Sequence, residues 1–333
     1  MSRISIIGAG AWGTALSVIL AGRGHAVRLW VYENELYRRL LETRENNVFL
    51  PGFCLPHNVV PSNTLGEALE GAEIVLTVTP SHVCRTVYRQ MLDHLRPETL
   101  FVSATKGLEA DTLMRMSEVA RQVFGERFNP RLAVLSGPTF AREIARGAPA
   151  AVVIASADPD LALHLQAEFS GPTLRLYASS DTTGVELGGS LKNIIAIGAG
   201  VCDGLDLGSN ALAALITRGL AEITRLATAC GAEASTLAGL AGLGDLVLTC
   251  TGALSRNRTL GIELARGRSL AEIQAGTPAV AEGVNTTVAA IRLAAQKGVE
   301  MPITEQMDAM LHHGRSPRQA IRTLMERSLK PEF

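Results

Sequence analysis

One short turn near the amino terminus, Gly8-Ala9-Gly10-Ala11-Trp12-Gly13, constrains the fold more than any other stretch of the sequence. It follows an apolar run, ISII, and opens a segment with helical spacing. Glycines in a G-x-G-x-x-G turn between a strand and a helix permit the tight turn, the close approach of backbone to a pyrophosphate, and close packing of helix on strand. The amino terminus of the helix then faces the negative charge. We therefore expect a βαβ unit that binds a dinucleotide through Gly8, Gly10 and Gly13.

The end of the second predicted strand bears on the choice of dinucleotide. The stretch Trp30-Val31-Tyr32-Glu33 lies about 20 residues beyond the last glycine, where an acidic side chain suits the ribose of NAD and an arginine suits the 2′-phosphate of NADP. Glu33 favours NAD, whereas Tyr32 could stack on adenine in either cofactor. We expect NAD(H) or NADP(H), and the sequence leaves the choice open.

Hydrophobic patterning divides the chain into two halves. The first alternates β-branched runs with helical patterns, which is typical of a parallel sheet covered by helices. Within it, the segment from Asn46 to Asn63 has three prolines and predicts an excursion over the surface rather than an element. After about Ser180, Ala, Leu, Gly and Ile recur at helical spacing. The predicted fold is an α/β Rossmann-type N-terminal domain, residues 1–183, followed by an all-α C-terminal domain, residues 184–333.

The individual elements follow from the same patterns. The predicted strands are Ile4–Ile7, Val27–Val31, Ile74–Val78, Leu100–Ser103, Leu132–Leu135, Ala151–Ile154 and Leu174–Tyr177. The predicted helices include Trp12–Arg23, His82–Leu95, Thr112–Phe124 and Pro159–Phe169, then Val185–Val201, Asn210–Ala229, Leu237–Leu243, Arg258–Arg266, Ser269–Ala275, Gly283–Lys297, Ile303–Leu311 and Pro317–Glu326.

Composition excludes several classes of partner. The 31 lysines and arginines balance 32 acidic residues, so there is no broad basic field for nucleic acid or an anionic membrane. The five cysteines form no C-x-x-C pair, which indicates neither a disulfide framework nor a metal site and suits the cytoplasm. Glycine or charge interrupts every apolar stretch approaching the roughly 20 residues of a membrane helix, so we expect no membrane span and no signal peptide.

A charged residue stands in an otherwise small and apolar run, ELGGSLKNIIAIGAG, at Lys192. A second, Asp245, stands in a similar run, AGLGDLVLTC. An unpaired buried charge is costly, so the two could pair with each other. They could form a purely structural ion pair, or Lys192 could exchange a proton with a substrate oxygen while Asp245 orients it.

Three further segments carry candidate ligand-binding groups. Ser255, Arg256 and Asn257 precede a predicted helix and form either an N-cap with solvated arginines or an anion site suited to a phosphate. The loops SATKGL, with Lys106, and SGPTFAREIA, with Gly137, each follow a predicted strand. Because such loops border the ligand crevice of an α/β sheet, we expect both near the substrate.

These motifs, in their order along the chain, give the sequence a specific resemblance. The sequence resembles the bacterial-type NAD(P)-dependent glycerol-3-phosphate dehydrogenases over nearly the whole chain. The segments that carry the resemblance are GAGAWGTAL, TVTPSH, SATKGL, SGPTFAREIA, ELGGSLKNIIAIGAGVCDGL, NALAALITRGLAE, LAGLGDLVLTCTGALSRNRTLG and AEGVNTT. The resemblance implies interconversion of sn-glycerol 3-phosphate and dihydroxyacetone phosphate, a step that supplies glycerophospholipid synthesis. It also suggests a homodimer.

The resemblance also assigns site residues. It implies that Lys192 is the proton acceptor. Substrate contacts fall on Lys106, Gly137, Thr139, Lys192, Asp245, Ser255, Arg256 and Asn257. Cofactor contacts beyond the glycines fall on Ala11, Trp12, Tyr32, Lys106, Ala141, Arg256, Val280 and Glu282. The chain departs from many relatives at Ser209 and Leu212, where a charged pair is common, and at Tyr32, where an arginine is common.

Other functions remain compatible with parts of the sequence. A 3-hydroxyacid or 6-phosphogluconate-type dehydrogenase shares both domain types and a catalytic lysine, but has an asparagine one turn later, where this chain has Ala196. A non-catalytic dinucleotide sensor needs only the first domain and leaves Lys192 and Asp245 unexplained. Oxidation through Cys202 or Cys250 lacks a histidine nearby in the sequence.

Overall fold

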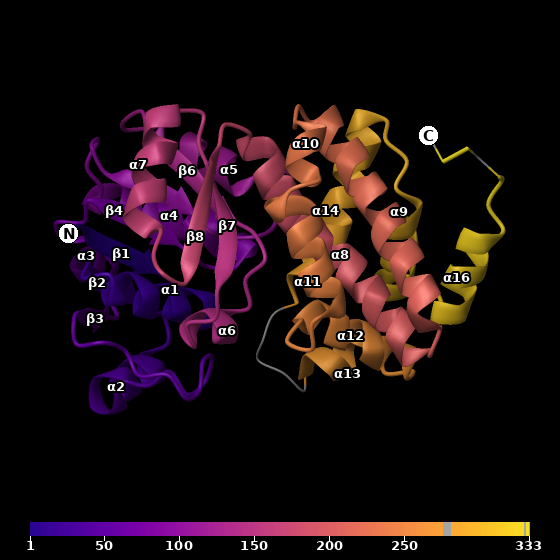
Figure 1. The fold of residues 1–333 in the computed structure, drawn as a ribbon, viewed down its shortest axis with the longest axis horizontal. Helices are drawn as coiled ribbons and strands as arrows, with labels where there is room; N and C mark the ends of the chain where they lie inside the picture. Colours follow the sequence, from indigo (N-terminus) through magenta and orange to yellow (C-terminus); the bar gives the residue numbers. More distant parts are fainter. Residues whose placement is uncertain (276–280, 330, 333) are drawn as a thin grey trace.

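A computed structural model describes residues 1–275, 281–329 and 331–332, and shows a sheet domain beside a helical domain (Figure 1). The sheet has eight strands in the order β3-β2-β1-β4-β5-β6-β7-β8. This order places β1 next to β4 inside the sheet, so the turn after β1 lies beside the turn after β4. The strands are β1 (Arg3–Ile7), β2 (Ala26–Trp30), β3 (Val59–Ser62), β4 (Ile74–Thr77), β5 (Leu100–Ser103), β6 (Arg131–Ser136), β7 (Ala150–Ala155) and β8 (Leu174–Ser179).

Helices connect the strands and supply both apolar layers of the sheet domain. One core cluster packs Leu16 and Leu20 of the first helix against β1 and β2, and a second packs Tyr88 and Phe124 around Phe101 of β5. The helices are α1 (Ala11–Gly22), α2 (Asn34–Thr43), α3 (Leu65–Leu69), η1 (Ser81–Val83), α4 (Cys84–Met91), η2 (Leu92–His94), α5 (Met116–Phe124), α6 (Ala141–Ala145) and α7 (Pro159–Phe169).

The expectation of a wholly parallel sheet is wrong at one pair of strands. β7 runs antiparallel to β6, with Val134 opposite Ala155, and β8 is parallel to β7. The connection from β6 to β7 contains only the five-residue helix α6. A parallel crossover usually returns along the sheet through a longer helix. Five helical residues rise only about 7.5 Å, so α6 does not carry the chain back to the edge where β6 begins, and β7 runs in the opposite direction.

Two other predictions need correction. The segment from Asn46 to Asn63 is not wholly an excursion, because β3 lies within it and pairs with β2. β3 is an edge strand, where Pro61 is tolerated because one side needs no ladder hydrogen bond. The helix predicted from Thr112 begins later, at Met116, because Leu113 has a φ of 62° and Leu108 bridges to Arg115.

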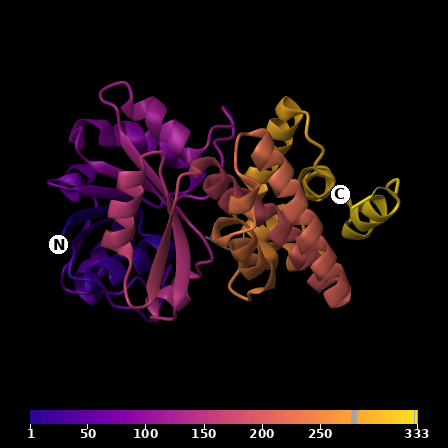
Figure 2. The ribbon, with the colours of Figure 1, turned by 45° about the horizontal axis from the view of Figure 1, so that its top comes forward.

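Among the described residues after Ser180, every regular element is a helix, as predicted, and the helices pack around one central helix (Figures 1 and 2). That helix, α8, is buried along nearly its whole length from Gly184 to Val201. The helices are α8 (Thr182–Gly204), α9 (Gly208–Ala229), α10 (Ala234–Leu237), α11 (Asp245–Thr251), α12 (Arg256–Ala265), α13 (Leu270–Ala275), α14 (Glu282–Lys297), α15 (Pro302–His312) and α16 (Pro317–Met325).

The helix predicted at Leu237–Leu243 is interrupted. The chain forms the short α10 and then a π-helical turn, η3 (Leu240–Gly244), that leads into α11. A Cβ on Gly242 would lie 2.0 Å from the carbonyl oxygen of Leu237, so the chain folds back on itself too tightly for one regular helix. The turn brings Asp245, the first residue of α11, against α8.

Two segments have the length and hydropathy of a membrane span, Thr182–Gly204 and Ala234–Thr251. The first is α8, and 94% of its most apolar window is buried inside the protein. The second combines α10, η3 and α11 and contains Asp245. α8 is therefore the core helix of the helical domain.

Candidate active site

The glycine turn has the geometry that a pyrophosphate requires. Gly8 has a φ of 120°, and a Cβ on Gly13 would lie 1.9 Å from the carbonyl oxygen of Gly8, so neither position accommodates a side chain without a shift. A Cβ on Gly10 would meet nothing within 4 Å, which leaves this side of the turn open. Ala11 and Trp12 begin α1, whose first turn presents backbone N–H groups to this space. These residues fit a dinucleotide.

Further predicted cofactor contacts, Tyr32 and Ala141, lie in the segments that follow β2 and β6. Tyr32 is 76% exposed, with its ring edge-on to Trp30 at 5.9 Å between centroids, so one face is free for a ligand. Glu33 immediately precedes α2 in an extended conformation. Ala141 begins α6 and packs partly against the same core cluster as Ala11 and Trp12. Val280 lies outside the described residues.

Three predicted residues meet at the junction of the two domains. Lys192 Nζ donates to Asp245 Oδ1 at 2.5 Å, and Lys106 Nζ donates to Asp245 Oδ2 at 2.7 Å. Lys106 also donates to the carbonyl oxygen of Gly137 at 3.1 Å, and Thr139 Oγ1 donates to the same oxygen at 3.2 Å. One fully buried carboxylate therefore holds a lysine from each domain.

The environment of Lys192 changes its acidity. Burial lowers the pKa of Lys192 to about 7, with Lys106 acting in the same direction and Asp245 opposing both. An ammonium in this place therefore gains or loses its proton near neutral pH. The same contacts are also those of the structural ion pair that the sequence leaves open.

Thr249 belongs to this cluster, although its sequence position was not singled out. Lys192 Nζ donates to Thr249 Oγ1 at 2.7 Å, and that hydroxyl donates to the carbonyl oxygen of Asp245 at 2.6 Å. Thr249 lies four residues after Asp245 in α11, so both side chains lie on the same face of the helix. This spacing is the signal that could have identified Thr249.

The Ser255-Arg256-Asn257 cluster lies beside the lysines, at the start of α12. Ser255 Oγ caps α12 by accepting from Arg258 N at 3.2 Å, as the structural alternative predicts. Asn257 Nδ2 donates to Asn193 Oδ1 at 3.0 Å and so connects α12 to the residue after Lys192. Asn257 Oδ1 also accepts from Gly283 N at 3.0 Å, which connects α12 to α14.

Arg256 and Glu282 are two charged groups that interact near the start of α12. The Arg256 side chain is solvent-exposed, yet surrounding protein lowers the pKa of its guanidinium, and Glu282 opposes this effect. Glu282 begins α14 and accepts from Ser81 Oγ at 3.0 Å, which joins the helical domain to η1. Burial raises the pKa of Glu282. Arg256 is thus accessible to a ligand while lying among protein atoms.

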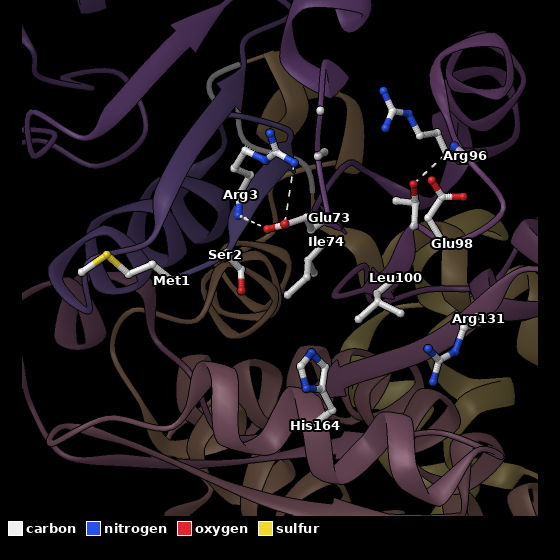
Figure 3. Close-up of a pocket in the computed structure, with 13 residues that line it drawn as sticks. Met1, Ser2, Arg3, Glu73, Ile74, Arg96, Glu98, Leu100, Arg131 and His164 are labelled. Carbon is white, nitrogen blue, oxygen red and sulfur yellow. Dashed lines mark hydrogen bonds and ion pairs between the residues drawn. The ribbon is translucent and has the colours of Figure 1, made fainter.

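A separate hollow lies at the opposite edge of the sheet (Figure 3). Its lining includes Arg3, Ile74, Leu100 and Arg131, each of which is the first residue of its strand. Lys106, Gly137 and the glycine turn instead follow the carboxyl ends of strands, where α/β sheets bind their ligands. This hollow is therefore distinct from the candidate active site. Within residues 1–275, 281–329 and 331–332, no group of His, Cys, Asp and Glu is arranged to hold a metal ion.

Comparisons with known proteins agree with this geometry. The family models for the NAD-dependent glycerol-3-phosphate dehydrogenase N-terminus and C-terminus match residues 3–162 and 181–322. A glycerol-3-phosphate dehydrogenase [NAD(P)+] of Koribacter versatilis is 60% identical over 98% of both chains. One of Syntrophotalea carbinolica is 53% identical over 99% of both chains.

Solved structures lead to the same family. The crystal structure of glycerol-3-phosphate dehydrogenase from Coxiella burnetii is 41% identical, has a TM-score of 0.94, and covers 98% of this chain and 99% of its own. The match extends through both the sheet domain and the helical domain, which a separate dinucleotide-sensing domain would not explain. The chain belongs to the NAD-dependent glycerol-3-phosphate dehydrogenase family.

Proposed function

We propose that this enzyme interconverts sn-glycerol 3-phosphate and dihydroxyacetone phosphate, with Lys192 as the group that exchanges a proton with the C2 oxygen. The reaction supplies glycerol 3-phosphate for glycerophospholipid synthesis. The observation that carries the proposal is the buried Lys192, whose pKa is lowered to about 7 beside Asp245. An acid–base group is most effective when its pKa lies near the working pH.

The surrounding residues orient Lys192 and leave one direction for the substrate. The glycine turn and the start of α1 would hold NAD(P), which would supply the hydride acceptor or donor for C2. An ammonium at Lys192 has three hydrogens, and among the described residues Asp245 and Thr249 accept two of them. The third can donate to the C2 oxygen and stabilise negative charge that develops there. Lys106, held on the other oxygen of Asp245, adds positive charge beside the reacting oxygen.

The phosphate of the substrate is assigned to the start of α12. The first turn of this ten-residue helix has backbone N–H groups besides that of Arg258, which Ser255 Oγ caps, and it carries the positive end of the helix dipole. Arg256 adds an exposed guanidinium at this turn. Because Asn257 bonds to Asn193, a phosphate held here has a fixed relation to Lys192. These features support a phosphorylated small molecule as the substrate.

We also place the enzyme in the cytoplasm as a homodimer, divided into domains at residues 183 and 184. All five cysteines are free, which suits a reducing compartment. Leu243 in η3, Val247 in α11 and Leu254 in the loop after α11 are exposed. A second copy of the chain would cover these apolar side chains. Sedimentation of the purified protein would test the dimer.

Initial rates with two pairs of reactants test the proposed reaction. We expect oxidation of NADH with dihydroxyacetone phosphate to exceed that with unphosphorylated dihydroxyacetone by a hundredfold or more in kcat/KM, since losing a charged hydrogen-bonded group costs about 2 to 4 kcal/mol. Replacing NADH by NADPH shows which cofactor is preferred. Equal rates with both ketones would refute the assignment of α12 to the phosphate.

A further inference from the structure

Asn46 is a buried amide that contacts the glycine turn from outside the cofactor crevice. Its side chain is 0% exposed, although it begins a segment that otherwise crosses the surface. Asn46 Nδ2 donates to the carbonyl oxygen of Ala9 at 2.8 Å and to Thr14 Oγ1 at 2.8 Å. Asn46 Oδ1 accepts from Phe49 N at 3.0 Å. All three bonds are consistent with the same orientation of the amide, with Nδ2 as the donor and Oδ1 as the acceptor.

The bond to Ala9 fixes the direction of the next peptide group. In a planar trans peptide, the carbonyl oxygen and the following N–H point in opposite directions. Because Asn46 holds the oxygen of Ala9 on its own side, the N–H of Gly10 points away from Asn46. At Gly10 the turn has open space, since a Cβ there would meet nothing within 4 Å.

The same amide also fixes the helix that follows the turn. Thr14 is fully buried in α1, its backbone N–H donates to the oxygen of Gly10 at 3.0 Å, and its hydroxyl donates to Ala9 at 3.4 Å. By holding Ala9 and Thr14 together, Asn46 sets the turn against the first turn of α1. The backbone N–H groups that would meet a pyrophosphate belong to this unit.

We propose that Asn46 is a positioning residue for cofactor binding, which orients the N–H of Gly10 and the start of α1 toward the pyrophosphate of the dinucleotide. The inference rests on the proposed function, because it takes the glycine turn as the cofactor site. It predicts that Asn46 acts on pyrophosphate binding and leaves the chemistry at Lys192 unchanged once cofactor is saturating.

Asn58 provides a matched control. It comes from the same segment, and its Nδ2 also donates to two backbone oxygens, those of Ala21 and His25, both at 2.8 Å. These bonds lie at the other end of α1, away from the turn. Asn58→Ala therefore removes bonds of the same chemistry without releasing Ala9.

The first test measures the dissociation constants of NADH and of ADP-ribose for the protein in the absence of the second substrate. ADP-ribose carries the pyrophosphate without nicotinamide. We expect Asn46→Ala to weaken both ligands by about tenfold or more, since buried hydrogen bonds are lost and the oxygen of Ala9 keeps only the longer bond from Thr14. Asn58→Ala should leave both constants within about twofold of the original. The KM of dihydroxyacetone phosphate and kcat at saturating NADH should not change in either variant.

Asn46→Asp gives a second readout that a merely structural role would not move. Near pH 8 the ionised carboxylate would face the oxygen of Ala9 and repel it, whereas near pH 5.5 a buried, protonated carboxyl could donate to that oxygen. We therefore expect the variant to bind ADP-ribose several-fold better at the lower pH than at the higher, relative to the original protein. This variant also serves if Asn46→Ala does not fold.

The outcomes separate the inference from the proposed function. If the original protein does not bind NADH, the proposed function fails. If the original protein and both Asn46 variants bind NADH and ADP-ribose equally well at both pH values, only the positioning role of Asn46 is refuted. A fall in melting temperature without any change in the two dissociation constants would refute it in the same way.

Discussion

At Lys192, burial of the ammonium lowers the stability of the fold, whereas the proposed reaction requires an ammonium in a buried site. Burial lowers the pKa of Lys192 to about 7, whereas in an unfolded chain a lysine titrates near its ordinary value of 10.5. Between these values the unfolded state binds more protons than the folded state, so the free energy of unfolding increases with pH. Below about pH 7 the full cost of the buried charge is present.

We predict that Lys192→Met separates these two effects. The methionine keeps much of the apolar stem, so the variant should be as stable as the original near pH 7 or more stable. It should also lose the increase of unfolding free energy between pH 7 and 10 that Lys192 causes. Turnover should fall by roughly a thousandfold, because acid–base catalysis and stabilisation of the oxyanion are lost together.

Denaturant unfolding at several pH values, NADH binding and steady-state rates check this prediction. Lys297→Met, an exposed lysine at the end of α14, is the matched control and should alter none of the three. In the original enzyme, the rate of alcohol oxidation should increase with pH around an apparent pKa near 7. A variant that unfolds readily while its folded fraction turns over normally would return Lys192 to a structural role.

At the scale of elements, glycine determines how closely α8 approaches its neighbours. A Cβ on Gly200 would lie 1.9 Å from the carbonyl oxygen of Arg258, and one on Gly261 would lie 2.0 Å from that of Ile197. The two helices α8 and α12 therefore cross with backbone against backbone. This contact places Asn257 beside Asn193 and the start of α12 near Lys192.

We predict that Gly200→Ala destabilises the protein by about 3 kcal/mol, at the upper end of the usual cost of overpacking, because the rigid backbone of α12 has to move. It should also raise the KM for the phosphorylated substrate, since the start of α12 moves with it. Gly22→Ala in α1 is the control, because a Cβ there would meet nothing within 4 Å and alanine favours a helix by up to about 1 kcal/mol. Denaturant unfolding of both variants distinguishes the cost of overpacking at Gly200 from the effect of alanine on helix propensity. Equal free energies of unfolding for the two variants would contradict the prediction.

The elements that the sequence predicts correctly are those whose causes are local. The strand ISII with its glycine turn, and the small-apolar run of α8, carry their signals within a few residues. β3 and the antiparallel β7 depend on pairing with distant strands and on the length of a connection, which periodicity does not record. At the site, Lys192 and Asp245 stand out as isolated charges, but the role of Asn46 depends on a contact across 37 residues.

At the scale of the whole molecule, the proposed active site is assembled from both domains. Lys106 comes from the sheet domain and Lys192 from α8, and both bind Asp245. Gly107 N donates to Ser190 Oγ at 2.8 Å, which fixes the loop of Lys106 to α8. Docking and catalysis are therefore coupled.

Glu186, in the second turn of α8, makes the most heavily bonded contact between the domains. Its buried carboxylate accepts from Ser117 N at 2.8 Å, from Ser117 Oγ at 2.6 Å and from Arg115 Nη1 at 2.9 Å. These donors belong to the start of α5, where a negative charge also suits the helix dipole. Burial raises the pKa of Glu186, and Arg115 opposes this effect most strongly.

We predict that Glu186→Ala uncouples the domains. It leaves Arg115 and the N–H of Ser117 buried without this partner, which should cost about 3 to 5 kcal/mol. NADH affinity should change little, because the glycine turn lies within the sheet domain, whereas kcat should fall at least tenfold as Lys106 and Lys192 lose their alignment.

Glu118→Ala is the control, since Glu118 also bonds Arg115, at 2.8 Å, but from within α5. Calorimetry should show a broader or two-step transition only for Glu186→Ala, and a single sharp transition with full kcat would mean that other contacts hold the domains together.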